Sequence, residues 1–386
     1  DLTKTWSKGV AILFAIGAVS GTVLSFELGL LWPGFMEHAG PIIGMPFSLE
    51  GTAFFLEAIA LGFYLYGWNR VNPWVHWASG WVVGLAGIAS GIFVVSANSW
   101  MNTPTGFDWV DGKAVNVDPI KALFNEAWFP QALHMCLAAF VALGFTVAGI
   151  HAFGLLRNPN HRLHKEAFKI AMWLGVLGAL LQILSGDQIA RFTARSQPLK
   201  LAAAEAFFET QKGAPLSIGG WPDMKEEKLK YALEIPRGLS FLAFRDANAE
   251  VKGMDAFSKE LWPPVPIVHV AFQLMVAIGI FLAGVSCLFL FIYFFRRQSL
   301  FNSKFLKLIV FCTPLGFIAI EAGWIVTEVG RQPWIIYGIM KTKDSLTPMP
   351  GLIVPFLLVT FIYVFLSVMV VWLMSRQFKS LTEKFS

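Results

Sequence analysis

Two side chains that can ligate haem iron lie inside separate apolar runs of this chain. His134 lies in the run 126–156, and Met275 lies in the run 266–295. A histidine and a methionine on facing helices are a standard axial pair for a low-spin haem, in which the thioether favours the reduced iron. Taken singly, His134 is also explained as a structural histidine bonded to a carbonyl, and Met275 as a packing residue among twelve methionines. Together the two residues predict a haem site and leave the packing alternative open.

Three carboxylates and one arginine accompany other apolar runs. Glu50 and Glu57 are seven residues apart, which places them on one face of a helix, two turns apart. Ionisable residues inside a membrane are costly and therefore mark functional sites, so this pair is either a proton path or a polar contact between helices. Glu328 ends a further apolar run, and Arg331 follows one turn later. These two form part of a site or a surface ion pair of little consequence.

The elements that position these residues are membrane-spanning helices. Hydrophobic residues make up 56% of the chain and charged residues 14%, a balance that a soluble domain of this size cannot place on its surface. The runs long enough to cross about 30 Å of hydrocarbon are 9–31, 46–68, 74–98, 126–156, 166–186, 266–295, 306–329 and 350–374. We expect an all-α bundle of eight spans that forms a single membrane domain over residues 1–386. Three isolated cysteines provide neither a disulfide framework nor a haem-attachment motif, so any haem is bound non-covalently.

The charges of the links orient the spans. Basic residues concentrate in three links and in the C-terminal tail: Arg70; Arg157, Arg162, Lys165 and Lys169; Arg296, Arg297 and Lys304; and Arg376, Lys379 and Lys384. The positive-inside rule makes these segments cytoplasmic, together with both termini, and leaves the long loop 187–265 outside. His134 and Met275 then lie eight and nine residues from the outer ends of their runs, at a matched depth of roughly 12 to 14 Å. The other histidines are expected to be hydrated ones in loops or near helix ends: His38, His76, His151, His161, His164 and His269.

Short stretches spread over the chain resemble those of one protein family. They are GD at 186–187, QPLKLAAAE at 197–205, EAGW at 321–324, EVGRQPW at 328–334, EG at 50–51, FFLE at 54–57, GWNR at 67–70 and ANSWM at 97–101. These stretches are similar to those of subunit I of the cytochrome bd quinol oxidases, and the resemblance runs from Asp1 to the last apolar run. Their length and order make the match far more specific than a lone short motif.

The resemblance implies a set of haem-binding residues. His134 and Met275 correspond to the axial ligands of the low-spin haem b558. Glu328 corresponds to the carboxylate ligand in the high-spin pair, haem b595 and haem d, and Trp324 would pack on a macrocycle one turn earlier. Arg331 would neutralise haem propionates.

The resemblance also implies proton and quinol sites. Glu50 corresponds to the glutamate beside the iron of haem d, and Glu57 to its deeper companion on the proton route. Lys200 and Glu205 correspond to the quinol-contacting residues of the outer loop 187–265, where a carboxylate accepts a proton as the quinol is oxidised. Because loops of this kind lie on the surface, we expect this segment to be mobile and exposed unless it closes on a quinol.

The chain departs from the family pattern at several places. The family's first helix, which carries a histidine ligand, has no counterpart, and we expect the native polypeptide to extend upstream of Asp1 by one apolar span of about twenty residues with this histidine. Gln273 stands where many members have an arginine, which weakens the positive field at the low-spin haem. Ser25 replaces a usual glutamate, with Glu27 two residues later, so a proton branch is expected to be missing or re-routed. The outer loop is of the short kind.

We therefore expect the haem-bearing subunit of a bd-type quinol oxidase, which oxidises membrane quinol and reduces oxygen to water in a respiratory chain. The expected partners are the bd oxidase subunit II, small single-span subunits, membrane lipid and a quinone, with no nucleic acid. The expected location is a bacterial or archaeal cell (inner) membrane. Three alternatives stay open: a bd-like reductase with another acceptor such as nitric oxide, a non-catalytic electron-transfer or scaffold subunit of a respiratory assembly, and a proton-coupled transporter.

Overall fold

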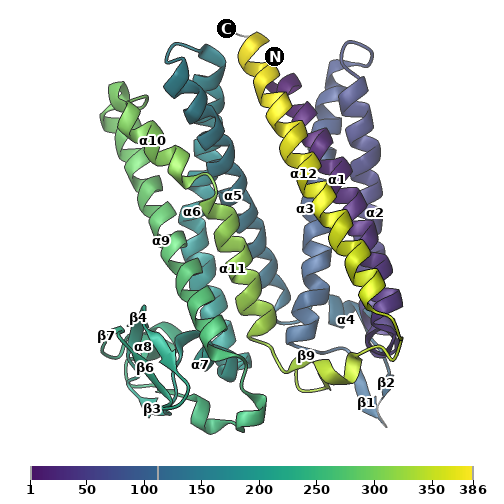
Figure 1. Cartoon of the computed structure of the whole chain (residues 1–386), viewed down its shortest axis with the longest axis vertical. Helices are drawn as coiled ribbons and strands as arrows, with labels where there is room; N and C mark the ends of the chain where they lie inside the picture. The colour runs from purple at the N-terminus through teal and green to yellow at the C-terminus, as the bar shows by residue number, and fades with distance from the viewer. Residues whose placement is uncertain (1, 111–112, 385–386) are drawn as a thin grey trace. The chain divides into compact units, whose positions relative to one another are not determined.

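Long apolar helices build the protein (Figure 1). The computed structural model describes residues 2–110 and 113–384. Within these residues, eight helical segments are long and apolar enough to cross a membrane, which confirms the expected all-α class. The spans are Leu2–Leu31 (α1), Pro33–Tyr66 (α2), Pro73–Asn102 (α3), Trp128–Arg157 (α5), Arg162–Ser196 (α6), Val265–Phe295 (α9), Ser303–Val329 (α10 and α11) and Ile353–Phe378, which belongs to α12 (Ile353–Lys384).

Helix α2 begins well before the run from which it was predicted. The expected start was residue 46, whereas α2 starts at Pro33 and continues through Pro41 and Pro46. A proline in the first turn lacks only an N–H that has no intrahelical partner there. Interior prolines are tolerated in membrane helices because neighbouring groups satisfy the freed backbone carbonyls. The link expected between the runs 9–31 and 46–68 is therefore largely helical.

Two other boundaries also differ from prediction. Helix α6 continues to Ser196, so the expected outer loop begins with helix. The span expected over 306–329 consists of α10 (Ser303–Cys312) and α11 (Leu315–Val329). Pro314 lies at the break because it has no N–H to donate, and the preceding N–H of Thr313 bonds to the carbonyl of Val310 at 3.2 Å in a tighter turn.

The chain divides into two compact units, which we describe separately. The first comprises Asp1–Trp100, Thr105–Asn125 and Lys343–Ser386, and the second comprises Met101–Pro104 and Glu126–Thr342. Both contain apolar spans, and the expectation of a single membrane domain stays a prediction.

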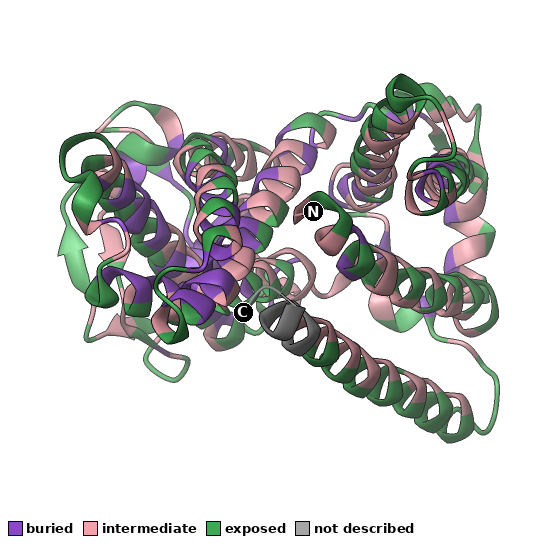
Figure 2. Cartoon of the chain, turned by 90° about the horizontal axis from the view of Figure 1, so that it is seen from above, coloured by how far each residue is buried: buried purple, intermediate pink, exposed green. Residues whose placement is uncertain are grey.

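The first unit contains α1, α2, α3 and α12. Its short elements are α4 (Pro119–Leu123) and the hairpin of β1 (Asp108–Val110) and β2 (Lys113–Val115). Helix α1 packs against α2 through the stacked rings of Phe14 and Phe54, 5.2 Å apart, and against α12 through a bond from the Tyr363 hydroxyl to the Ser20 carbonyl at 3.2 Å. None of the apolar window of α12 is buried, as the helix that ends at the C-terminus in Figure 2 shows. Such a surface suits lipid or another membrane subunit.

The second unit has the more extensive core. Helices α5, α6, α9, α10 and α11 pack there around fully buried side chains such as Phe145, Met172 and Phe289. Helices α5 and α6 approach so closely that a Cβ added to Gly144 would lie 2.3 Å from the backbone nitrogen of Gly175. Small residues allow this approach, which is how membrane helices gain packing contacts without a hydrophobic driving force between them.

The loop between α6 and α9 is an ordered cap at one end of the second unit (Figure 1). It contains α7 (Pro198–Glu205) and α8 (Gly238–Phe244), two 3₁₀ turns (Met254–Ala256 and Lys259–Leu261), and three antiparallel strand pairs. These pairs are β3 (Gln211–Lys212) with β8 (Glu250–Val251), β4 (Leu216–Ile218) with β7 (Leu233–Ile235), and β5 (Trp221–Asp223) with β6 (Lys228–Lys230). A further 3₁₀ turn (Arg297–Ser299) follows α9, the pair β9 (Trp334–Ile336) and β10 (Met340–Lys341) follows α11, and a last 3₁₀ turn spans Thr342–Ser345.

Candidate functional site

His134 faces helix α6 from helix α5. Its Nδ1 lies 3.1 Å from the hydroxyl of Ser185, and its Nε2 lies 3.1 Å from the amide nitrogen of Gln182. An amide nitrogen can only donate, so Nε2 is the ring atom with the lone pair and Nδ1–H donates to Ser185. This tautomer is the one that metal-bound histidines adopt, with the second nitrogen fixed by a hydrogen bond. A Cβ added to Gly186 would lie 3.6 Å from His134 Cε1, an ordinary contact distance, so the backbone of α6 passes close to the ring.

Met275 faces helix α11 from helix α9. A Cβ added to Gly323 would lie 3.1 Å from the Met275 sulfur, closer than ordinary van der Waals contact allows. Only glycine at position 323 leaves the sulfur where it is. His134 and Met275 thus lie in the same unit, each beside a glycine, and their pairing across one haem stays a prediction.

Arg331 and Glu328 form an ion pair at the end of α11. Arg331 is 3% exposed, and its Nη2 donates to the Glu328 carboxylate. Among the described residues, Arg331 Nε and Nη1 have no hydrogen-bond partner. Burial lowers the pKa of Arg331, and the Glu328 carboxylate opposes this shift. The alternative of a surface ion pair is wrong for its arginine, which is buried with unused donors that suit an acidic ligand, whereas the Glu328 side chain is 42% exposed.

Lys200 lies beside this ion pair in the folded chain. Its Nζ donates to the side-chain oxygen of Asn102 at 2.7 Å, and a Cβ added to Gly330 would lie 3.2 Å from its Cγ. Burial is the main cause that lowers the pKa of Lys200 to about 7. The positive charge of Arg331 acts in the same direction, and the Glu328 carboxylate opposes the shift. Helix α7 and the end of α11 therefore bring the predicted quinol-loop lysine next to the predicted haem-site charges.

Glu205 is the last residue of α7 and is also buried. It is 5% exposed, and its Oε2 has no hydrogen-bond partner within the described chain. Burial raises the pKa of Glu205 to about 8. Because all residues from Leu199 to Glu205 are buried, the expectation of an exposed segment is wrong, and its mobility stays a prediction. The segment packs against α9 instead, in a cluster that includes Val265 and Val268.

Glu50 and Glu57 both face α3 in the first unit. The Ser90 hydroxyl donates to Glu50 Oε1 at 3.2 Å, and a Cβ added to Gly87 would lie 3.3 Å from both Glu57 oxygens. Ser90 and Gly87 are three residues apart, hence on one face of α3. The prediction that both glutamates share a helix face is confirmed.

Four histidines expected to be hydrated are buried, so that expectation is wrong for them. They are His151, His161, His164 and His269. The Nδ1 atoms of His151 and His164 are 2.8 Å apart, and His161 accepts a bond from the His164 backbone N–H at 3.3 Å. Position along the chain misled the prediction, because contacts with residues elsewhere in the chain bury these rings, such as His164 beside His151 and Ala204 beside His269.

His269 and Gln273 contact the outer loop and were not predicted as functional residues. His269 is fully buried, with Nδ1 2.8 Å from the Ala204 carbonyl. Gln273 accepts from the Gly219 N–H at 3.0 Å and donates to the Ser217 carbonyl at 3.1 Å. Their spacing in the sequence could have pointed to them, because two polar residues four apart in an apolar helix share one face.

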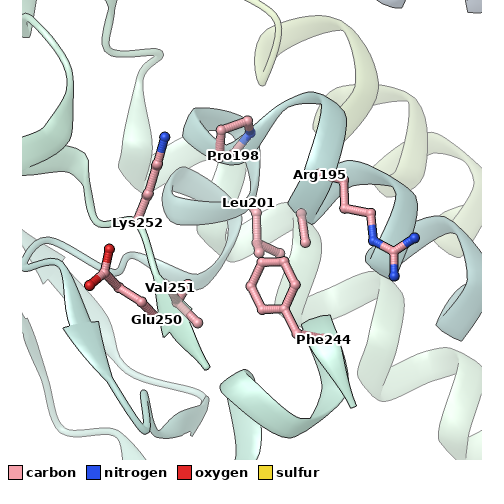
Figure 3. Close-up of a pocket in the computed structure, with 8 residues that line it drawn as sticks. Arg195, Pro198, Leu201, Phe244, Glu250, Val251 and Lys252 are labelled. Atoms are coloured by element: carbon pink, nitrogen blue, oxygen red, sulfur yellow. The ribbon is translucent and has the colours of Figure 1, made fainter. Parts of the chain in front are cut away.

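A pocket of about 310 Å³ opens between α7 and the loop strands (Figure 3). Apolar atoms of Leu201, Phe244 and Val251 line it, with the charged side chains of Arg195 and Lys252 at its edge. Lys200 and Glu205 are not among its lining residues, so it does not bring the predicted quinol residues together.

The fold and these buried groups define a polytopic membrane protein with an ordered polar site at one end of its helices. The chain belongs to the family of the cytochrome bd terminal oxidase subunit I, which it matches over residues 1–382. It is 38% identical to a chain of the solved bd oxidase from Geobacillus thermodenitrificans, with a TM-score of 0.91, covering 97% of this chain and 87% of the other. It is 32% identical to the cytochrome bd ubiquinol oxidase subunit 1 of Bacillus subtilis strain 168, over 99% of this chain and 84% of the relative. It is also 28% identical to the cytochrome bd-II ubiquinol oxidase subunit 1 of Escherichia coli K12, over 89% and 80%.

Proposed function

We propose that this chain is the haem-bearing, quinol-oxidising subunit of a quinol:oxygen oxidoreductase of the cytochrome bd type. The family and the relatives named as ubiquinol oxidases support this activity. The observation that carries the site is the burial of Lys200 and Glu205 on one short helix, where their pKa values shift in opposite directions. Opposed pKa shifts of this kind are typical of sites that transfer protons.

Glu205 acts as the proton acceptor for the quinol. Oxidation of a quinol to a quinone releases protons with the electrons, so a base must lie at the quinol hydroxyl. Because burial raises the pKa of Glu205 to about 8, the carboxyl is mostly protonated at neutral pH, and the minority of molecules with a carboxylate have a stronger base than an exposed glutamate. That carboxylate takes the proton that the quinol releases. Its partnerless Oε2 is the atom available for this hydrogen bond.

Lys200 orients the other end of the quinol ring. Asn102 holds its Nζ, and the Gln197 amide donates to the Asn102 carbonyl at 2.7 Å, which fixes that asparagine. An ammonium group whose pKa lies near 7 donates a hydrogen bond when protonated and accepts a proton when neutral. The two residues together hold the ring and take its protons.

The residues fit the haems that the family implies. His134 Nε2, whose lone pair accepts from the Gln182 amide, and the Met275 sulfur are groups that can ligate iron, and Arg331 has unused donors for a propionate. We assign His134 and Met275 to haem b558. Glu328 and Trp324, which is 37% exposed, are assigned to the high-spin pair, haem b595 and haem d. Glu50, in the first unit, is assigned separately as a carboxylate that contacts a haem iron. When bound, the haems supply the electron transfer and the oxygen chemistry.

Glu57 and Glu50 carry protons in the first unit. Both carboxylates face α3, and Ser90, whose hydroxyl donates to Glu50, extends the polar groups along that helix.

We further assign a bacterial or archaeal cell membrane, cytoplasmic termini for the described chain, and a complex with subunit II and small single-span subunits. The unburied apolar surface of α12 supports a membrane partner or lipid there.

The test of the quinol site is Glu205→Gln in the membrane complex. The amide keeps the size of the side chain but cannot take a proton at neutral pH, so quinol-driven oxygen consumption is expected to fall about a hundredfold or more. Reduction of the haems by an artificial donor is expected to continue. The matched control is Glu209→Gln, an exposed carboxyl in the same loop, which should leave both rates unchanged. Normal quinol turnover by Glu205→Gln would exclude Glu205 as the proton acceptor.

A further inference from the structure

His269 and Gln273 lie four residues apart on α9, at the end of the helix that meets the outer loop. Residues at this spacing point to the same side of a helix. Both side chains are directed at backbone groups of the loop and not at other membrane helices. They therefore connect a membrane span to the segment that carries Lys200 and Glu205.

The Gln273 side chain makes two hydrogen bonds with the turn after β4, one as an acceptor and one as a donor. Its side-chain oxygen accepts from the Gly219 N–H at 3.0 Å, while its nitrogen donates to the Ser217 carbonyl at 3.1 Å. An amide is the neutral side chain that can both accept and donate at one end. Arginine, which the resemblance places here in many relatives, has no acceptor for the Gly219 N–H.

The backbone conformation of this turn allows the contact with Gln273. Gly219 and Gly220 have φ of +68° and +99°, a region that side-chain-bearing residues rarely adopt. The left-handed backbone leaves the Gly219 N–H with Gln273 and the Gly219 carbonyl 3.3 Å from His269 Nε2. A neutral imidazole has one N–H to donate, so the hydrogen bond of His269 goes to the nearer Ala204 carbonyl, 2.8 Å from Nδ1, and the Gly219 carbonyl only lies against the ring.

His269 extends the contact to the residue next to Glu205. Its Nδ1 lies 2.8 Å from the Ala204 carbonyl, at the last turn of α7. Ala206, on the other side of Glu205, ends the helix in the left-handed region at φ +48°. The contact at Ala204 and the helix end at Ala206 thus hold the backbone on both sides of Glu205.

We infer that His269 and Gln273 form a clamp that holds the outer loop on α9 and positions Glu205 for the quinol. The inference rests on the proposed quinol site at Glu205. The two residues are positioning residues, since they touch the loop backbone and not the quinol.

The test compares Gln273→Leu, Gln273→Glu and the control Val270→Leu in the complete membrane complex. Leucine can neither donate nor accept, whereas glutamate keeps the acceptor for Gly219, and Val270 is exposed on the same helix. Two measurements are made: the rate of tryptic cleavage at the exposed Lys225 in the β5–β6 turn, and KM and kcat for quinol beside turnover with an artificial donor. Cleavage follows the population of the undocked loop.

For Gln273→Leu we expect cleavage about tenfold faster, because two hydrogen bonds are lost. We also expect a higher KM for quinol, since only the docked loop binds it, and an unchanged rate with the artificial donor. Gln273→Glu should cleave more slowly than Gln273→Leu, and Val270→Leu should match the wild type. Wild-type cleavage in Gln273→Leu would overturn the clamp, and faster cleavage with an unchanged KM would overturn its role in positioning Glu205. A different result, normal quinol turnover by Glu205→Gln, would show that the proposed quinol site itself is wrong.

Discussion

A substitution of Gly323 tests most directly whether the Met275 sulfur is an iron ligand at its present position. A Cβ at this position would lie 3.1 Å from the Met275 sulfur. The optimum separation of nonbonded heavy atoms is about 3.5 to 4.0 Å, so Gly323→Ala requires a displacement of roughly half an ångström. The methionine side chain is unbranched and flexible, which makes it the group that moves.

The effect on stability is expected to be small, because two terms oppose each other. Alanine in a helix interior is favoured over glycine by about 1 kcal/mol. Overpacking by one methyl group costs about 1 to 3 kcal/mol, and the flexible sulfur places this site near the lower value. The variant should therefore fold and unfold within a few degrees of the wild type. The displaced sulfur should nevertheless weaken its bond to the iron, so the low-spin b band in the reduced-minus-oxidised spectrum should shift or broaden.

Gly186→Ala is the matched control. Its Cβ would lie 3.6 Å from His134 Cε1, an ordinary contact distance, so it gains the same helix preference without compressing a ligand. We expect a wild-type spectrum from this variant. If Gly323→Ala also has a wild-type low-spin band while folding normally, Met275 is not an axial ligand held at this position.

Two further predictions follow from individual side chains. Met275→Leu nearly conserves volume and should keep the fold, yet lose the low-spin b band together with quinol oxidation; an unchanged spectrum would exclude the assignment. The buried carboxyl of Glu205, with its pKa raised to about 8 from 4.5, binds a proton in the folded state that the unfolded state releases, so its contribution to stability falls as the pH rises from about 4.5 to 8. Lys200, with its pKa lowered to about 7 from 10.5, acts in the opposite direction and makes stability rise between about pH 7 and 10.5. Thermal unfolding of the wild type should lose more stability between pH 5 and 7 than that of Glu205→Gln; equal losses would contradict the buried, protonated carboxyl.

The sequence by itself determined the spans and the faces of single helices. Eight apolar segments were predicted and are present in the described residues, because hydropathy over about twenty residues reports directly on membrane insertion. The shared face of Glu50 and Glu57 also followed from helical periodicity alone. The break at Pro314 was missed although the sequence contains it, because proline disrupts some membrane helices and is accommodated in others, such as α2 at Pro41 and Pro46.

Only the tertiary structure decided what surrounds the candidate site residues. Lys200 and Glu205 lie outside the apolar spans, in a segment predicted to be exposed, and they are buried because α7 packs on α9 and beside the end of α11. Arg331 and His269 are buried for the same reason, by contacts with residues far away in the sequence. Burial and the pKa shifts that it causes depend on the sum of all neighbours and not on the local pattern, so no periodicity could have given them. The resemblance identified these residues, and the fold supplied the burial and the contacts that give them a chemical role.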